Sequence, residues 1–194
     1  TIFCTGKHQK EEIEKTEAVY GLPKKRLVEF GYPLLDKMRE DYRCTERKTH
    51  EEKRILIAPS WQADNIMDSC LEGLLDSLAG RGYQITVRPH PQYVRHYADE
   101  MEQLRTAFDD HPKIEIQTDF SSNSTVFQAG IVITDWSDIA YEFAYTTGRP
   151  VLFINTPMKV MNEDYKELGI TPIDVELRSE IGKSIDLDNL KALP

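Results

Sequence analysis

Residues 131–157, with the sequence IVITDWSDIAYEFAYTTGRPVLFINTP, carry side chains whose types and spacing suit the binding of an anion. An apolar run at 131–133 is followed by TDWSD at 134–138 and then by a helical pattern. This order predicts a strand, a polar turn and a helix. Unpaired N–H groups and the helix dipole attract negative charge at the first turn of a helix. The segment therefore predicts a seat for a phosphate group.

Four side chains around this turn are candidates for binding a donor or its phosphate. Ser137 and Asp138 stand at the predicted helix start, where they either flank a bound phosphate or cap the helix, because both roles use the same N–H groups. Asp135 is predicted to orient the turn, and Glu142 to face a ribose hydroxyl one helical turn on; either is alternatively an ordinary capping or surface acid. No G-x-S-x-G string surrounds Ser137, so a nucleophilic serine is disfavoured.

A second candidate string, RPHP at 88–91, supplies cationic groups. Arg88 could clamp a phosphate through two parallel hydrogen bonds. His90 lies between two prolines, where it could donate a hydrogen bond to a diphosphate oxygen or protonate a leaving phosphate. The alternative is a plain turn, in which the prolines end a strand and His90 is solvated.

Five predicted strands end in polar, hydroxyl-rich or basic residues. The strands cover residues 55–58, 84–87, 114–117, 131–134 and 151–154. Because helical patterns alternate with them, we expect βαβ units, and hence an α/β fold with a Rossmann-like parallel sheet flanked by helices. Ligands bind outside the carboxyl ends of such strands. Ser60, two residues beyond the first strand, joins the candidate donor-binding residues for this reason.

The other elements define three expected regions. Helical patterns cover residues 8–20, 66–78 and 94–108, with Asp64 or Asn65 as the cap of the second. Residues 124–129 are expected to form a short helix or a turn, and residues 27–30 a short strand. We expect an N-terminal helical and linker segment over 1–50, with a charged linker near 45–53. A nucleotide-donor-binding domain is expected over 51–178. Residues 179–194 are expected to be a tail, weakly patterned and helical if ordered.

Composition excludes several classes of function. A net charge of −9 and a pI near 5.1 disfavour a protein that binds duplex nucleic acid. Three cysteines without CxxC spacing favour reduced thiols in the cytoplasm. The five histidines lack metal-binding spacing, and neither a P-loop nor GxGxxG is present, so no metal and no cofactor is predicted. The chain begins with Thr1, and we expect it to be a piece of a longer protein.

Several strings follow one another in the order found in one enzyme family. They are GYPLLD at 31–36, APSW at 58–61, RPHP at 88–91, ITDWSDIAYEFA at 133–144 and GRPV at 148–151. Together they resemble the CDP-glycerol glycerophosphotransferases, the teichoic-acid primases and polymerases. The resemblance implies a GT-B fold, of which this chain would be the C-terminal, nucleotide-binding half. CDP-glycerol or a related CDP-alditol would then sit at the strand exits.

The resemblance also implies roles for residues and partners. His90 would touch the diphosphate as the catalytic residue of this half, and Ser137 with the amides after it would hold phosphate. A polyol phosphate would pass to a hydroxyl of a lipid-linked polymer acceptor, releasing CMP, in a protein peripheral to the cytoplasmic face of the membrane. The family's general-base histidine belongs to the N-terminal half, so this chain is expected to bind nucleotide without turnover.

Three positions depart from the family strings. Gln62 stands where the family favours Arg, Asp138 where Ser is frequent, and Glu142 where Asp is frequent. Asp138 adds negative charge beside the expected phosphate, which leaves the donor open. The alternatives are a GT-B glycosyltransferase that uses a nucleotide sugar and a non-catalytic nucleotide-binding module. The oligomeric state is left open as well.

Overall fold

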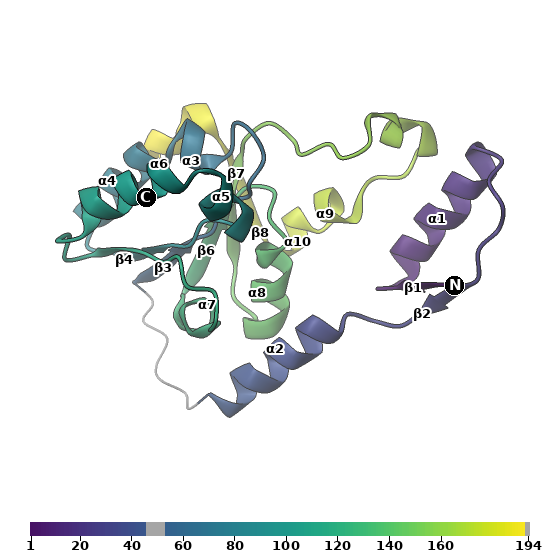
Figure 1. Ribbon diagram of the computed structural model, residues 1–194, viewed down its shortest axis with the longest axis horizontal. Coiled ribbons are helices and arrows are strands. Elements are labelled where there is room, and N and C mark those ends of the chain that lie inside the picture. The colour runs from purple at the N-terminus through teal and green to yellow at the C-terminus, as the bar shows by residue number, and fades with distance from the viewer. Residues whose placement is uncertain (46–52, 193–194) are drawn as a thin grey trace.

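The computed structural model describes residues 1–45 and 53–192 of the chain. Its main body is a six-stranded parallel sheet with helices on both faces, which confirms the predicted α/β class (Figure 1). The strand order is β5-β4-β3-β6-β7-β8. The strands are β3 (Arg54–Ile57), β4 (Gln84–Val87), β5 (Ile114–Ile116), β6 (Ile131–Thr134), β7 (Val151–Asn155) and β8 (Gly182–Asp186).

The strand order creates a crevice at one point of the sheet. The chain enters at β3, moves outward through β4 and β5, and returns to place β6 on the other side of β3. Connections from β3 and β6 therefore leave in opposite directions, which opens a ligand-sized gap at their carboxyl ends. Ile57 of β3 pairs with Val87 of β4 and with Ile133 of β6, so the three strands end level with one another.

Two of the predicted helices are each broken into a pair. The pattern at 66–78 forms α3 (Ile66–Ser69) and α4 (Leu71–Gly80), and that at 94–108 forms α5 (Pro91–His96) and α6 (Ala98–Phe108). The pattern at 66–78 runs on through its break because α3 and α4 pack into the same core. Asn65, rather than Asp64, caps α3 by accepting a hydrogen bond from the Met67 N–H at 2.6 Å.

Alternate strand side chains build two hydrophobic cores, one on each face. Ile55 and Ile57 of β3 pack with α3 and α4 on one face. Leu56, on the other face, packs with α7 (Ser124–Gln128) and α8 (Ile139–Thr147). This alternation is the period of two that a pleated strand imposes. Burial on both faces explains why these strands are continuously apolar in sequence.

An N-terminal unit precedes the sheet. It consists of β1 (Ile2–Cys4), α1 (Lys7–Val19) and β2 (Leu27–Glu29), and β1 pairs with β2 in parallel. The helix and strand predicted at 8–20 and 27–30 are confirmed, whereas α2 (Pro33–Cys44) was not predicted. Helix α2 lies against α8, where Met38 is buried in the second core (Figure 1). Most of the linker predicted at 45–53 lies outside the described residues.

The region after residue 178 differs from expectation. Helix α9 (Ile173–Glu176) and helix α10 (Arg178–Ile181) lead into β8, and the 3-10 helix η2 (Leu187–Ala192) follows. Residues expected to form a tail thus supply the outermost strand of the sheet, beside β7. Its sequence, GKSID, has no apolar run because an edge strand is partly solvated. Hydrophobic patterning consequently could not predict it.

Candidate functional site

A pocket of about 270 Å³ lies at the carboxyl ends of the strands. Residues that directly follow β3, β4 and β6 line it, together with Phe120 after β5 and Lys159 after β7. Six of the seven predicted site residues line this single pocket: Ser60, Arg88, His90, Ser137, Asp138 and Glu142. The topology brings them together because all five strands end at the same edge of the sheet.

The first turn of α8 presents free hydrogen-bond donors to the pocket. Asp138 occupies the N-cap position, but its side chain forms no capping hydrogen bond. The first backbone bonds run from the Ala140 N–H to the Ser137 carbonyl and from Tyr141 to Asp138. In the described part of the chain, no hydrogen bond uses the N–H groups of Ser137, Asp138 or Ile139. These three amides are the helix-terminal donors that an anion can occupy.

Asp135 lies beneath the pocket and does not line it. Its carboxylate is 1% exposed and accepts hydrogen bonds from the backbone N–H groups of Ser60 at 2.7 Å, Trp136 at 2.8 Å and Ile66 at 3.2 Å. The carboxylate therefore joins the end of β3, the turn after β6 and the start of α3. This geometry supports the predicted orienting role and leaves the carboxylate occupied by protein amides.

Ser60 contributes a buried hydroxyl to the pocket. The residue is 1% exposed, and its Oγ has no hydrogen-bond partner among the described residues. An unpaired buried hydroxyl costs about 1–3 kcal/mol. Ser60 lines the cavity but its Oγ is shielded, so a ligand oxygen would remove this cost once the hydroxyl turns toward the pocket.

His90 is held in one tautomer by its own helix. Its Nδ1 accepts a hydrogen bond from the Gln92 N–H at 3.1 Å and so caps α5. The proton of the neutral ring is therefore assigned to Nε2. Burial lowers the pKa of His90, and the positive charge of Lys159 lowers it further, while Asp138 acts in the opposite direction. His90 is thus a neutral hydrogen-bond donor at pH 7.

Arg88 is half-buried and faces the loop that leaves β5. Its guanidinium donates to the Ser122 carbonyl at 3.3 Å and to Asn123 Oδ1 at 3.4 Å, and its centre lies 5.5 Å from the Phe120 ring. Burial lowers the pKa of Arg88, against the effects of Glu142 and Asp119. The hydrogen bonds are long, so Arg88 holds this loop loosely at the rim of the pocket.

Glu142 connects the pocket to the N-terminal part of the chain. Its Oε1 accepts a hydrogen bond from the hydroxyl of Tyr32 at 2.7 Å, and Tyr32 immediately precedes α2. Burial and this hydrogen bond raise the pKa of Tyr32, so the phenol stays protonated. The carboxylate predicted to face a ribose is therefore already hydrogen-bonded within the protein.

The structure adds two residues that were not predicted, Arg178 and Lys159. Arg178 is 6% exposed, and its guanidinium lies between the rings of Trp136 at 4.1 Å and Phe153 at 4.4 Å. It donates to the Asp135 carbonyl at 3.2 Å, so it supports the turn after β6 from below. No local pattern could show this contact, because the partners are distant in sequence. Lys159 lies a few residues after β7, a strand that the sequence did predict, so its position near the site could have been noticed.

The described residues contain neither a metal-binding cluster nor a membrane-spanning helix. Within 1–45 and 53–192, no group of three or more His, Cys, Asp or Glu side chains is placed to hold a metal ion. In the same residues, no helix combines the length and apolar character needed to cross a bilayer.

Comparison with known proteins places these features in a family. A model of the family described as CDP-glycerol:poly(glycerophosphate) glycerophosphotransferase matches residues 6–167. The minor teichoic acid biosynthesis protein GgaB of Bacillus subtilis (strain 168) is 25% identical over a 197-residue alignment, which covers 86% of this chain and 20% of GgaB.

Two solved structures of the wall teichoic acid polymerase TagF are also similar. Both are of a His-to-Asn variant soaked with CDPG, for 15 and for 30 minutes. Each covers 98% of this chain, at 17% identity and a TM-score of 0.47, and this chain covers 49% and 50% of the two TagF chains. The chain thus spans a fifth of the length of GgaB and about half that of TagF.

Proposed function

Because the chain belongs to the CDP-glycerol:poly(glycerophosphate) glycerophosphotransferase family, we propose that its pocket binds the CDP-activated polyol donor of such a transferase. The donor is CDP-glycerol or a related CDP-alditol. One observation carries the proposal: the unpaired amides of Ser137, Asp138 and Ile139 meet the Nε2–H of His90 and the unpaired Ser60 hydroxyl in one pocket. All of these groups donate hydrogen bonds, as a diphosphate requires.

Each donor has a distinct role in this proposal. The amides at the start of α8 hold phosphate oxygens along the helix axis, where the dipole adds to the attraction. His90 donates from Nε2 to a diphosphate oxygen. Of its two predicted roles, hydrogen-bond donation is the better supported, because the Gln92 N–H occupies Nδ1 and the pKa is lowered. Proton transfer to a leaving phosphate would require protonated Nδ1.

The proposed reaction is the transfer of a polyol phosphate. An acceptor hydroxyl attacks the polyol-bearing phosphorus, the bond to the CMP oxygen breaks, and the hydroxyl proton passes to a base. Positioning and stabilisation of the charge on the diphosphate supply the catalysis contributed by this chain. The base and the lipid-linked polymer acceptor are assigned to the N-terminal half of a GT-B protein on the cytoplasmic face of the membrane. The chain alone is then expected to bind nucleotide without turnover.

The domain assignment follows from the same proposal. Residues 1–50 lead into the donor-binding domain, whose core was predicted to occupy 51–178. We extend that domain to include β8, since this strand pairs along its whole length with β7. We also include η2, because Leu187 and Leu190 pack against the hydrophobic core that contains Ile55 and Ile57.

Calorimetric titration of the chain with CDP, CMP, UDP and GDP tests the proposed function. We expect CDP to bind more tightly than UDP or GDP, and more tightly than CMP because it carries the second phosphate. Preference for UDP or GDP would favour a transferase that uses a nucleotide sugar. An absence of heat with all four nucleotides at millimolar concentration would contradict both enzyme hypotheses and leave a non-nucleotide module.

A further inference from the structure

A segment that crosses from the sheet to the N-terminal unit passes the mouth of the pocket. We call residues 156–169 the strap; they lead from β7 to the 3-10 helix η1 (Glu163–Leu168), which packs against α1 (Figure 1). At the sheet end, the Trp136 ring N–H donates to the Thr156 carbonyl at 3.0 Å. At the other end, the Tyr20 hydroxyl donates to Glu167 at 3.0 Å. The strap is therefore held at both ends.

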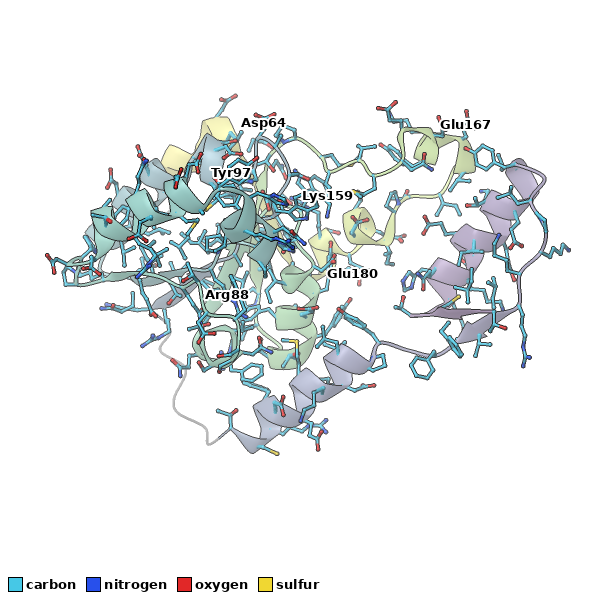
Figure 2. All side chains as sticks on the ribbon, in the orientation of Figure 1. Asp64, Arg88, Tyr97, Lys159, Glu167 and Glu180 are labelled. Carbon is cyan, nitrogen blue, oxygen red and sulfur yellow. The ribbon has the colours of Figure 1, made fainter. Side chains whose placement is uncertain are left out.

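Lys159 is the strap residue that lines the pocket. Its side chain is half-buried, and no hydrogen bond or ion pair within residues 1–45 and 53–192 uses its ammonium group. In Figure 2 Lys159 lies near the middle of the molecule, where the strap leaves the sheet domain. A half-buried lysine that lines a pocket, and whose ammonium has no partner among the described residues, is available to a ligand.

The charges that line the pocket show why a further cation is needed. Asp138 and Glu142 bring two carboxylates, whereas Arg88 is the one permanent cation recognised from sequence. Arg88 also shares its hydrogen bonds with the loop at 122–125. Without Lys159 the charged side chains of the lining carry two negative charges and one positive charge; with it, the two carboxylates are balanced by two cations.

Lys159 and His90 face the same space. The charge of Lys159 lowers the pKa of His90, so the ammonium lies within electrostatic reach of the imidazole. His90 and Asp138 line the pocket beside Lys159. The strap therefore brings its ammonium to the side of the cavity where His90 presents Nε2–H.

We propose that Lys159 is a donor-binding residue whose ammonium contacts the diphosphate in the pocket that the amides at the start of α8 also line. This inference rests on the proposed function and adds a specific cation to it. Lysine acts at phosphates as a mobile point charge, and the two anchors of the strap limit its motion. Because one anchor is Tyr20 of the N-terminal unit, that unit contributes to the donor site through the strap.

Replacement of Lys159 tests the proposal by calorimetry with CDP and CMP. Lys159→Met keeps the apolar stem and removes the charge, and we expect CDP affinity to fall about 10-fold or more, as for the loss of a hydrogen bond between charged groups. The loss for CMP should be smaller, because CMP carries less negative charge. Lys159→Arg should restore most of the CDP affinity. Lys166→Met, on the same strap but outside the pocket, is the matched control and should bind as wild type does.

A ligand-free measurement supports the same test. In Lys159→Met the pKa of His90, followed by NMR, should rise, because a neighbouring positive charge has been removed. If the wild-type chain binds CDP and Lys159→Met binds it equally well, the role of Lys159 is refuted while the proposed function stands. An equal loss in Lys166→Met would show a general charge effect and also refute it. If the wild-type chain binds no nucleotide, both proposals fail.

Discussion

At the scale of single residues, His90 illustrates how a local hydrogen bond limits chemistry. Its position after β4 exposes the ring to the pocket, but the Gln92 N–H occupies Nδ1. The ring can thus donate from Nε2 and, while neutral, has no free nitrogen that could act as a base. The base must therefore be another residue, which agrees with the proposal that the N-terminal half of the protein supplies it.

His90 should have a measurable tautomer and a lowered pKa. Long-range ¹H–¹⁵N NMR of the ligand-free chain should show the Nε2–H tautomer, with a titration midpoint below the usual value of about 6.5. Since folding lowers this pKa, His90 contributes stability above pH ~6.5 that is lost as the pH falls through the folded-state pKa. A midpoint above 6.5, or a dominant Nδ1–H tautomer, would contradict the assigned role.

Ser60 should show opposite effects on stability and on binding. Ser60→Ala removes a buried hydroxyl that has no partner among the described residues, so the free energy of unfolding should be unchanged or higher by up to about 1 kcal/mol. The same variant should bind CDP more weakly, since the ligand loses a donor. Urea unfolding with and without CDP measures both quantities. A destabilised variant with normal affinity for CDP would indicate a structural hydroxyl instead.

At the scale of elements, the first turn of α8 is set by its neighbours. Asp135 gathers three backbone N–H groups beneath it, and Arg178 of α10 donates to the Asp135 carbonyl. The Trp136 ring is held by the same guanidinium and by the Thr156 carbonyl. The amides of residues 137–139 stay free because the nearby acceptors, the carboxylate and the carbonyl of Asp135, are already occupied by other donors.

The edge strand β8 depends on a glycine that approaches β7 closely. A Cβ atom at Gly182 would lie 1.9 Å from the Val151 carbonyl oxygen, so Gly182→Ala must push the two strands apart. We expect a loss of about 1–3 kcal/mol in the free energy of unfolding, as for other overpacked sites. Gly73→Ala in α4 is the matched control. No atom outside its own helix lies within 4 Å of a Cβ built there, and the change should stabilise by about 0.5–1 kcal/mol.

Urea denaturation of both glycine variants decides this point. Similar stabilities for Gly182→Ala and wild type would mean that β8 is not packed against β7 as described. The comparison also tests whether the sheet domain extends beyond residue 178, because a detached tail would tolerate alanine at position 182.

At the scale of the whole molecule, the residues that precede the sheet contact the sheet domain on two sides. On one side, Tyr32, just before α2, bonds to Glu142, and Arg149 donates to the hydroxyl of Tyr42 in α2 at 2.9 Å. On the other side, the strap runs from β7 to α1. Movement of the N-terminal unit would therefore act on the strap that carries Lys159 and on the Tyr32 hydroxyl that bonds to Glu142. This arrangement suits a transferase in which donor binding and domain position are coupled.

The sequence alone determined the α/β class, the positions of five strands of the main sheet and the family. These features are local: an apolar run followed by polar residues marks a buried strand and its exit, and the family strings lie at those exits. Parallel strands end at one edge, so Ser60, Arg88, His90 and Ser137 could be expected to share a site. Such patterns could not predict the edge strand β8, because its sequence has no apolar run. They could not predict the helix breaks either, because the apolar spacing continues through each break.

Only the tertiary structure decided which groups in the site are free to bind. Asp135, Arg88 and Glu142 look equally available in sequence, yet each is hydrogen-bonded to residues distant along the chain. The Ser60 hydroxyl and the Lys159 side chain have no such partners within the described residues. The physical reason is that these hydrogen bonds depend on which loops after the strands, and which connecting segments, lie close together in space. Residue type and spacing therefore located the site, and long-range hydrogen bonding determined which of its groups remain for a ligand.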